Sequence, residues 1–378
     1  MIIGFDAKRA FSNHTGLGNY SRYVIRNLSV FCPEHRYRLY APKDTVYPDI
    51  VSIRERNNVA SVFPRGFNKI FPSLWRTKTV VSDLVRDGVQ LYHGLSGELP
   101  VGLEKAGIRS VVTVHDLIFL RYPGYYKPID RSIYIRKLRY ACRKADHIIT
   151  VSECTQKDVI SFFGIDPEKI SILYQGCDAS FHVPVTDAEK ERVQKKYRLP
   201  ETFLLNVGTI EARKNLLTAV KSLLHLDASI HLVAVGRETA YAGHVKSFVA
   251  AHSLESRVHL LTGVPLSDLP AVYQSAAVFV YPSFYEGFGI PLIEALYSRV
   301  PVIAALGSCL LEAGGPNSLY LNPEDVQAFA SAIHKILNND VLRDKMVAEG
   351  KRYVTRFDDN LLAGQMMQLY QKVMDKKY

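Results

Sequence analysis

Apolar runs typical of β-strands alternate with helix-like patterns along the whole chain. In the first half, strands are predicted near 2–6, 36–41, 89–93, 110–114, 146–151 and 169–174, and helices over 19–31, 72–86, 130–144 and 153–163. In the second half, strands are predicted near 202–208, 230–236, 257–262, 277–281, 300–304 and 318–321, and helices over 215–225, 241–252, 267–275, 290–298 and 324–337, followed by a helical tail from about 340. This alternation is typical of βαβ units, so we expect an α/β protein with parallel sheets.

The chain is long enough, at 378 residues, for two domains that each have a core. A polar, charge-rich stretch, His182–Arg198, separates the two sets of strands. We therefore predict domains over 1–182 and 183–378, with a last helix near 358–378 that could cross back to the first domain. Ligands of open α/β sheets bind beyond the carboxyl ends of the strands, so the expected site is a cleft between the two sheets.

Composition excludes several classes of protein. The chain is 47% hydrophobic and 22% charged, without a transmembrane run, and its N-terminus enters a strand without the pattern of a signal peptide. The five cysteines are scattered and form no Cys/His ligand cluster, which favours free thiols in a reducing compartment over a zinc site. We expect a cytoplasmic protein, with peripheral association at the inner face of the cytoplasmic membrane left open.

The net charge of +10 lies mostly in the first half. Residues 1–180 contain 26 Lys/Arg against 17 Asp/Glu, which is +9, and the remainder contains 21 against 20, which is +1. Residues 121–144 carry eight Lys/Arg and one acid, and residues 56–82 mix basic and aromatic residues without any acid. These stretches suit an anionic membrane surface or a phosphate-bearing acceptor, although an amphipathic helix with a solvated basic face would look the same. No nucleic-acid-binding motif is present.

The segment Tyr281–Glu294 predicts a strand, a glycine-bearing turn and a helix that begins near Pro291. Two carboxylates, Glu286 and Glu294, bracket this corner. The free amides at the positive end of the helix dipole are those of Gly287, Phe288 and Gly289. Amides can hold an anion and carboxylates accept hydrogen bonds from sugar hydroxyls, so the corner suits a ligand that is part phosphate and part sugar. The alternative is a plain glycine turn with solvated glutamates.

Arg213 and Lys214 follow another predicted strand end. Two fixed cations can neutralise a diphosphate, with Arg binding it bidentately and Lys acting as a point charge. The alternative is a solvated basic loop.

Gly16 and Gly18 link the first strand to the first helix, where they would let the backbone approach a phosphate or a sugar closely. A complete dinucleotide fingerprint would need glycine where Ser21 stands, so a nicotinamide or flavin site is not supported. The alternative is a tight turn without a ligand.

His115 and His93 end two further strands and could hydrogen-bond sugar hydroxyls, although a lone histidine at a strand end is often structural.

Taken together, these segments resemble retaining glycosyltransferases of family 4, which have the GT-B fold of two facing Rossmann-like domains. The resemblance covers nearly the whole chain and rests on Thr15–Tyr20, Thr113–Leu117, Val151–Glu153, Val207–Asn215 and Glu286–Glu294. The Glu-x7-Glu segment is the most specific of these motifs. Many members place Arg directly after the glycine of the 207–215 motif, whereas Thr209 stands here, so neutralisation of the diphosphate would depend more on Arg213.

The resemblance implies roles for single residues. The implied catalytic residues are Arg213, Lys214, Glu286 and His115. The implied donor-binding residues are Gly16, Gly18, Gly208, Arg213, Lys214, Gly236, Thr262, Val264, Glu286, Gly287, Phe288, Gly289, Ile290 and Glu294. The implied acceptor-side residues are Asn19, Tyr20, His93 and Asp116. Within these sets, Glu294 would bind the ribose hydroxyls, Glu286 the donor sugar, and Arg213 with Lys214 the diphosphate.

The implied activity is retaining transfer of a hexose from a nucleotide sugar to a lipid-linked or surface-polysaccharide glycan. Tyr92–Pro100 and Thr113–Leu117 resemble bacterial mannosyltransferases, so GDP-mannose is the first expected donor, followed by UDP-glucose and UDP-N-acetylglucosamine. Neither a cofactor nor a metal is expected, since no Asp-x-Asp motif ends a strand. The alternatives are a GT-B sugar-nucleotide epimerase or phosphorylase, and a non-catalytic protein that binds a sugar nucleotide.

Overall fold

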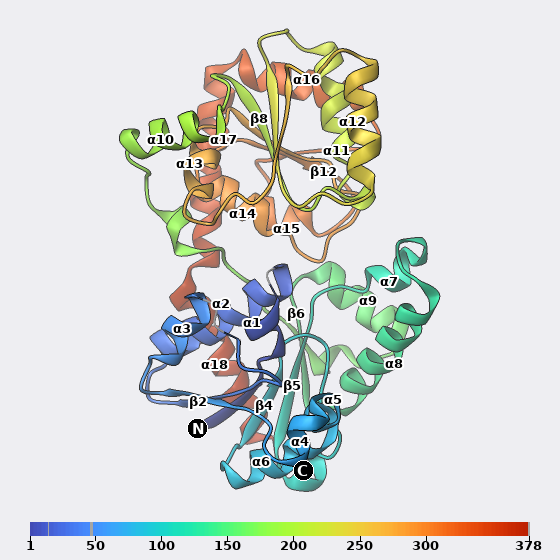
Figure 1. Ribbon diagram of the computed structural model, residues 1–378, viewed down its shortest axis with the longest axis vertical. Coiled ribbons are helices and arrows are strands. Elements are labelled where there is room, and N and C mark those ends of the chain that lie inside the picture. Colours follow the sequence, from blue (N-terminus) through green and yellow to red (C-terminus); the bar gives the residue numbers. More distant parts are fainter. Residues whose placement is uncertain (14, 46–47, 377–378) are drawn as a thin grey trace. The chain divides into compact units, whose positions relative to one another are not determined.

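The computed structural model describes residues 1–13, 15–45 and 48–376, which form two compact units (Figure 1). The first unit contains residues up to Gln175 and the C-terminal segment from Asp358, and the second contains Gly176–Phe357. The sequence analysis placed the boundary after residue 182. Residues 176–182 lie instead with the second unit, because the buried Phe181 ring packs edge-on against Tyr273, with their centroids 5.3 Å apart.

The first unit is built on a seven-stranded sheet in which every paired strand is parallel. Its strands are β1 (Ile2–Asp6), β2 (Arg36–Tyr40), β3 (Val59–Val62), β4 (Leu91–Gly94), β5 (Arg109–Val114), β6 (His147–Thr150) and β7 (Ile170–Ile172). Their order is β3-β2-β1-β4-β5-β6-β7, so the direction of strand addition reverses between β1 and β4.

The second unit repeats this plan with a six-stranded parallel sheet. Its strands are β8 (Phe203–Val207), β9 (His231–Val235), β10 (Val258–Leu261), β11 (Val278–Tyr281), β12 (Val302–Ala305) and β13 (Leu319–Leu321). The order β10-β9-β8-β11-β12-β13 reverses between β8 and β11. The two Rossmann-like units confirm the predicted α/β class and the two-domain organisation with parallel sheets.

Two local predictions for the first unit were wrong. The edge strand β3 was not predicted, because it has only four residues and just one of them, Val59, is fully buried. The helix predicted over 72–86 is interrupted by a π-helical segment, Trp75–Thr79. Trp75 is fully buried there, and its indole N–H donates to Asp83 over 2.6 Å. The tertiary contacts of this side chain therefore determine the π-helical geometry.

Helices flank both sheets in Figure 1. The helices of the first unit are α1 (Lys8–Ser12), α2 (Gly16–Phe31), α3 (Pro48–Arg54), α4 (Phe67–Ile70), α5 (Pro72–Leu74), α6 (Val80–Arg86), α7 (Ile118–Arg121), α8 (Pro128–Lys144), α9 (Glu153–Phe163) and α18 (Asp359–Asp375). Those of the second unit are α10 (Asp187–Tyr197), α11 (Leu216–Ser222), α12 (Tyr241–Ala251), α13 (Leu269–Gln274), α14 (Ile290–Tyr297), α15 (Leu310–Gly314), α16 (Val326–Leu337) and α17 (Asp340–Val354).

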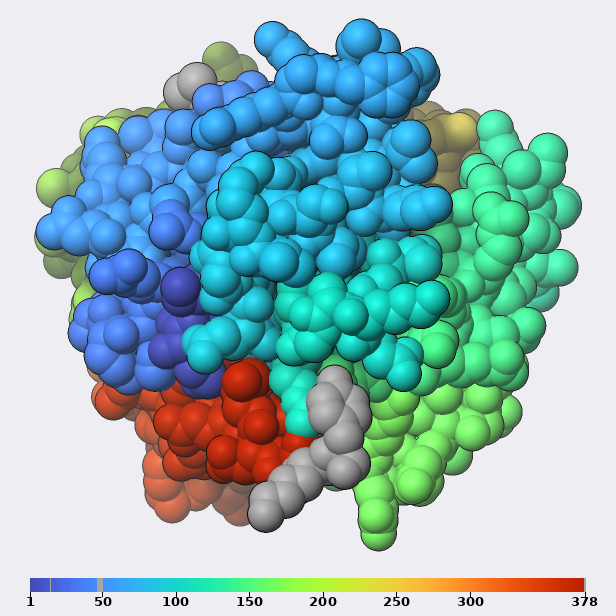
Figure 2. All heavy atoms as spheres, turned by 90° about the horizontal axis from the view of Figure 1, so that it is seen from below, coloured from blue at the N-terminus to red at the C-terminus, as the bar shows by residue number. Residues whose placement is uncertain are grey.

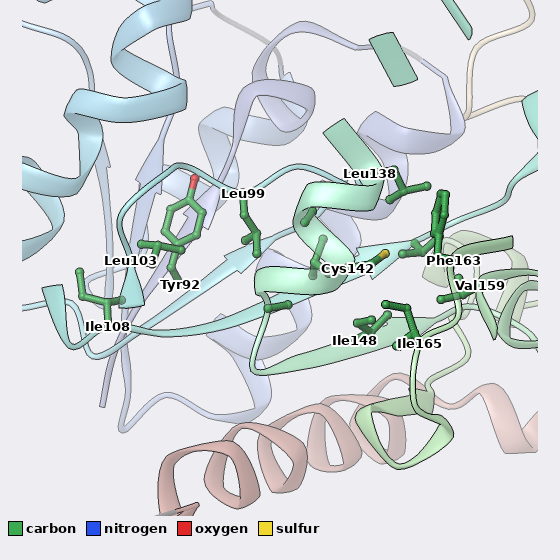
Figure 3. Packing of buried hydrophobic residues seen from close by; sticks show 14 of the residues in the cluster. Tyr92, Leu99, Leu103, Ile108, Leu138, Cys142, Ile148, Val159, Phe163 and Ile165 are labelled. Atoms are coloured by element: carbon green, nitrogen blue, oxygen red, sulfur yellow. The ribbon is translucent and has the colours of Figure 1, made fainter. Parts of the chain in front are cut away.

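Each unit has its own hydrophobic core. Figure 3 shows Leu138 and Cys142 of α8 packed near Ile148 of β6 and Phe163 of α9. A comparable cluster in the second unit joins Leu204 of β8 to helices α11, α12 and α16. Within the described residues, no helix is both long enough and apolar enough to cross a membrane.

Candidate functional site

The predicted charged residues of the second unit meet where the strand order reverses. Strands β8 and β11 are direct neighbours, so the loops after their carboxyl ends emerge side by side. The first loop carries Arg213 and Lys214 before α11, and the second carries Glu286 before α14. Such a switch point is where open α/β sheets bind ligands, since the two loops diverge and leave room between them.

Glu286 lies at the centre of this site and pairs with both cations. Its Oε1 lies 2.7 Å from Lys214 Nζ, and its Oε2 lies 2.9 Å from Arg213 Nη1. Ser283 and Tyr281 donate hydroxyl hydrogen bonds to Oε1 over 2.7 and 3.1 Å. The structure therefore joins Glu286 to two predicted site residues that lie more than 70 positions earlier in the sequence.

The charge state of Glu286 follows from its surroundings. Burial by itself would raise the pKa of this carboxyl, because desolvation disfavours the anion. The positive charges of Lys214 and Arg213 outweigh that cost and lower the pKa to about 2. Glu286 is consequently ionised at neutral pH and holds the two cations in fixed positions.

Arg213 has further partners that orient its guanidinium group. It donates to Glu211 over 2.7 Å and to the carbonyl oxygen of Tyr285. Its own carbonyl oxygen accepts a hydrogen bond from the Phe284 amide over 2.9 Å. Backbone and side chain of Arg213 thus tie the loop after β8 to the loop after β11.

Lys214 is held by an aromatic side chain as well as by its carboxylate. Its ammonium group donates to the Tyr281 hydroxyl and lies 5.1 Å from the centroid of that ring. A ring at this distance attracts a cation electrostatically. The aliphatic end of Lys214 lies beside Gly208, where a Cβ would be 3.6 Å from Lys214 Cε.

Gly208 and Gly236, two of the implied donor-binding residues, lie at neighbouring strand ends where a side chain is disfavoured. Gly208 has φ +152°, and a Cβ on Gly236 would lie only 1.8 Å from the Gly208 carbonyl oxygen. Any side chain at position 236 would force the ends of β8 and β9 apart. Thr262 and Val264 follow the next strand, β10, at the same edge of the sheet; Thr262 is exposed and Val264 half-buried.

Helix α14 begins under tight packing. Its N-cap Gly289 has φ +134°, and a Cβ there would lie 3.0 Å from Leu310 and 3.1 Å from Ala313 of α15. The buried Cys309 thiol lies 3.0 Å from the Glu286 carbonyl oxygen and 2.9 Å from that of Phe288, to either of which it can donate. These contacts fix the glycine turn of residues 287–289 and the first residue of the helix, Ile290.

Glu294 lies within α14 in an environment opposite to that of Glu286. The Tyr273 hydroxyl donates to its Oε2 over 2.7 Å, and none of the described Lys or Arg side chains forms an ion pair with it. Burial raises the pKa of Glu294 to about 7, and the nearby Asp178 charge adds to the increase. The carboxyl group is therefore balanced between its acid and its anion near neutral pH.

In the first unit, the two glycines predicted to link the first strand to the first helix lie instead in the first turn of α2. One of them is closely packed and the other is open. A Cβ on Gly18 would lie 1.8 Å from the Asn13 carbonyl oxygen, so only glycine fits. Gly16 is exposed at the first residue of the helix. The buried Arg22 guanidinium donates to Asn13 O over 2.9 Å and to the Asn19 side chain over 2.6 Å, which fixes the turn.

His115 follows β5 and is half-buried. Its Nε2 lies 2.9 Å from the Leu95 carbonyl oxygen, so Nε2 carries the proton in this arrangement. Burial lowers the pKa of His115 to about 4, so the ring is neutral at pH 7. The edge of the Tyr20 ring packs against it, with centroids 4.5 Å apart. A neutral imidazole of this tautomer offers Nδ1 as a hydrogen-bond acceptor.

His93 lies deeper, in a network that joins the last helix to the sheet. Its two ring nitrogens lie 2.6 Å from the Tyr370 hydroxyl of α18 and 2.8 Å from Thr113 Oγ1. The Tyr20 hydroxyl lies 3.0 Å from the same Thr113 oxygen. Burial lowers the pKa of His93 to about 3, so this ring is also neutral. The network gives His93 and Tyr20 a structural role in the first unit.

Asn19 and Asp116, the other predicted acceptor-side residues, also make local contacts. Asn19 accepts from Arg22, and Asp116 accepts from the Ile118 amide over 3.1 Å at the start of α7. Asn19 lies in the first turn of α2, and Asp116 lies between β5 and α7.

Several residues of the site were not singled out by sequence reasoning. These residues are Tyr273, Tyr281, Ser283, Glu211 and Thr113. Tyr281 and Ser283 lie inside the Tyr281–Glu294 motif, so their hydroxyl groups were available as a signal. Tyr273 had none, because only packing places its hydroxyl against Glu294. Among the described residues, no cluster of three or more His, Cys, Asp or Glu side chains could hold a metal ion.

Comparisons with known proteins agree with this geometry. Residues 187–353 match the model of glycosyl transferases group 1, and residues 16–181 match that of Glycosyltransferase Family 4. O-antigen chain mannosyltransferase B of Escherichia coli is 33% identical over 273 residues, which are 71% of this chain and 70% of that protein. The O-antigen chain mannosyltransferase RfbU of Salmonella typhimurium is 31% identical over 252 residues, 66% of each protein.

A solved structure extends the comparison to the whole fold. HepE of Anabaena, in complex with UDP-glucose, superimposes with a TM-score of 0.77 at 16% identity and covers 98% of this chain and 99% of its own. The two parallel sheets and these matches define a glycosyltransferase of the GT-B type. More specifically, the chain belongs to the glycosyltransferases of group 1 and family 4.

Proposed function

We propose that this protein transfers a hexose, and first of all mannose from GDP-mannose, to a lipid-linked or surface-polysaccharide glycan. The observation that carries the proposal is the cluster of Arg213, Lys214 and Glu286 at the switch point of the second sheet. The two relatives described above, O-antigen chain mannosyltransferase B and RfbU, are mannosyltransferases, which supports the choice of sugar. That HepE binds UDP-glucose supports a nucleotide sugar as donor.

The proposed chemistry follows from where charge develops. When the bond between the anomeric carbon and the diphosphate breaks, negative charge grows on the departing phosphate oxygen. Arg213 and Lys214 stabilise that charge, and they need little reorganisation because Glu286 already holds them. One such preorganised donor is typically worth about 3 kcal/mol of barrier. Glu294, as an anion, accepts hydrogen bonds from the ribose hydroxyls.

We propose retention of configuration without a metal. The acceptor hydroxyl oxygen bonds to the anomeric carbon on the face that the diphosphate leaves, and its proton passes to the leaving phosphate oxygen. The neutral His115 ring, with Nδ1 as acceptor, suits a hydrogen bond from a hydroxyl of the transferred sugar. A lipid-linked acceptor also implies that the enzyme acts at the cytoplasmic face of a membrane.

Two measurements test this function. The first is thermal unfolding in the presence of GDP, UDP, ADP and their common sugars, with and without EDTA. The unfolding temperature should rise selectively with one nucleotide. At a hundredfold excess over Kd, the bound nucleotide stabilises the folded state by about 2.7 kcal/mol. Incubation of the matching donor with a lipid-linked glycan should then give a product of unchanged anomeric configuration by NMR. Conversion of a UDP-sugar without any acceptor would favour an epimerase. Dependence on inorganic phosphate would favour a phosphorylase. Nucleotide binding without turnover would favour a non-catalytic protein.

A lysine substitution tests the site itself. Lys214→Ala should lower turnover by about 100-fold or more, because it removes a stabiliser of the leaving group. The matched control is Lys246→Ala, since Lys246 also lies 2.7 Å from a carboxylate, Glu238, but on the exposed surface of the same unit. Equal turnover in the two variants would refute the site assignment.

A further inference from the structure

The two short helices after β3 expose every large apolar side chain that they carry. The exposed fractions are 68% for Phe67, 69% for Ile70, 49% for Phe71 and 47% for Leu74. The Phe67 and Phe71 rings lie 5.0 Å apart, so the side chains form one cluster. A contiguous apolar cluster that stays exposed on a folded protein is typical of an interaction site.

Helix α8 presents a second unusual surface. Its outward face carries Ile129, Ile133, Arg136, Tyr140 and Arg143, which follow one another at intervals of four and three residues and therefore line one side of the helix. Ile129 is 76% exposed, while the opposite face is buried through Leu138 and Ala141. No acidic residue follows Asp130 within the helix.

The basic end of this helix borders a shallow hollow of about 510 Å³. Four of the side chains that line it are cations, namely Arg136, Arg139, Arg143 and Lys144. The hollow is therefore suited to anionic groups.

The apolar cluster and the basic helix belong to one surface. Arg76, two residues after Leu74, and Lys137 of α8 both bind Oε2 of Glu98, the lysine over 3.2 Å. In Figure 1 the ribbon of α5 lies beside that of α8, and Figure 2 shows the corresponding blue and green segments on neighbouring parts of the same face. We call residues 67–74 together with 129–144 the α4–α8 surface.

We propose that the α4–α8 surface binds a membrane that contains anionic phospholipids. The apolar side chains of α4 and α5, with Ile129 and Ile133, enter the interfacial region, and the cations of α8 contact headgroup phosphates. Exposed apolar side chains beside a row of cations match a planar surface that is anionic outside and apolar beneath. The inference rests on the proposed function, because a lipid-linked acceptor would bring the enzyme to such a surface.

The first test is flotation of the whole protein with vesicles of phosphatidylcholine, alone or mixed with phosphatidylglycerol. Binding should require phosphatidylglycerol and weaken with salt. Each Lys or Arg near an anionic surface strengthens binding about fivefold, so R136Q/R139Q/R143Q should weaken it by roughly 100-fold. The control K345Q/K351Q/R352Q removes the same charge from the exposed positions of α17 and should bind as the unaltered protein does.

The second test concerns the apolar cluster. F67S/I70S should weaken vesicle binding by roughly tenfold, because two side chains lose their transfer from water. The control V183S/V341S alters two apolar side chains of the second unit that are 58% and 81% exposed. Trp75, the single tryptophan of the chain, directly follows Leu74, so brominated acyl chains should quench its fluorescence if this surface faces the lipid.

The outcomes separate this inference from the proposed function. Nucleotide-induced thermal stabilisation should be the same in all four variants, since none alters the donor site. Equal binding to both kinds of vesicle, or equal binding by the surface variants and their controls, would overturn the proposal. Self-association that is abolished by F67S/I70S, without vesicle binding, would show that a second copy covers the surface instead. Vesicle binding without glycosyl transfer would leave the docking surface intact and refute only the proposed activity.

Discussion

The candidate residues of the two units are held in place by different physical means. In the second unit, Arg213, Lys214 and Glu286 are fixed by ion pairs between the loops after β8 and β11. In the first unit, His115 and His93 are neutral, and hydrogen bonds and ring packing hold them. Of these candidate residues, the charged ones lie in the unit where a phosphate would leave, and the two neutral histidines lie in the unit proposed to meet the transferred sugar.

A similar difference separates the two carboxylates of one strand–turn–helix corner. Glu286 and Glu294 are both largely removed from water, which by itself raises the pKa of each. Two cations reverse that effect at Glu286, whereas at Glu294 the hydrogen bond from the Tyr273 hydroxyl offsets it only in part. The same residue type in one motif is therefore a permanent anion at one position and a titrating group at the other.

The largest effect is expected when the charged site loses its central anion. Glu286→Ala leaves two buried cations without their shared partner, which should lower the free energy of unfolding by about 3–5 kcal/mol in urea denaturation. Added GDP should restore part of the loss, because its diphosphate replaces the missing charge. Glu238→Ala, which removes the exposed partner of Lys246, is the control and should cost less than about 1 kcal/mol. Similar losses in the two variants would contradict a preorganised buried site.

An intermediate effect is expected from the pH dependence of Glu294. Because the folded pKa is raised from 4.5 to about 7, the folded state binds the proton more tightly, and this group's contribution to stability is lost as the pH rises from 4.5 through 7. Ribose hydroxyls need the anion, so nucleotide affinity should increase roughly tenfold between pH 6 and pH 8 by calorimetry.

Two variants sharpen that measurement. Glu294→Gln should abolish the pH dependence of nucleotide affinity. Tyr273→Phe removes a hydrogen bond that favours the anion, so the midpoint should move to higher pH. A pH profile that is the same in Glu294→Gln as in the unaltered protein would assign the titration to another group.

The smallest effect is expected in the neutral network of the first unit. Tyr370→Phe removes one hydrogen bond to His93 and should lower the free energy of unfolding by about 1 kcal/mol in urea denaturation. Nucleotide binding should be unchanged, since the cations proposed to bind the diphosphate lie in the second unit. If Tyr370→Phe lowered the free energy of unfolding as much as Glu286→Ala does, the neutral network would be as important for stability as the ion-paired site, which would contradict the comparison.

Sequence reasoning predicted the parts of the site that depend on local pattern. Gly18 and Gly289 lie in glycine-bearing turns that the pattern identified, and there a side chain is excluded or φ is positive. Gly208 and Gly236 were implied by the family resemblance. Charged residues that follow strand ends were found because all parallel strands point their carboxyl ends to one edge. The partners of these residues were not found when, like Tyr273, they lie inside a short buried helix that carries no recognisable motif.

The sequence by itself determined that the chain forms two βαβ-type units and which loops carry Arg213, Lys214, Glu286 and Glu294. Periodicity, glycine and proline act over a few residues, so this information can be read locally. Only the tertiary structure decided that Glu286 is an anion of pKa about 2, that Glu294 titrates near 7, and that His93 belongs to a buried network. Those properties depend on burial and on contacts between residues far apart in the chain, which no local pattern contains.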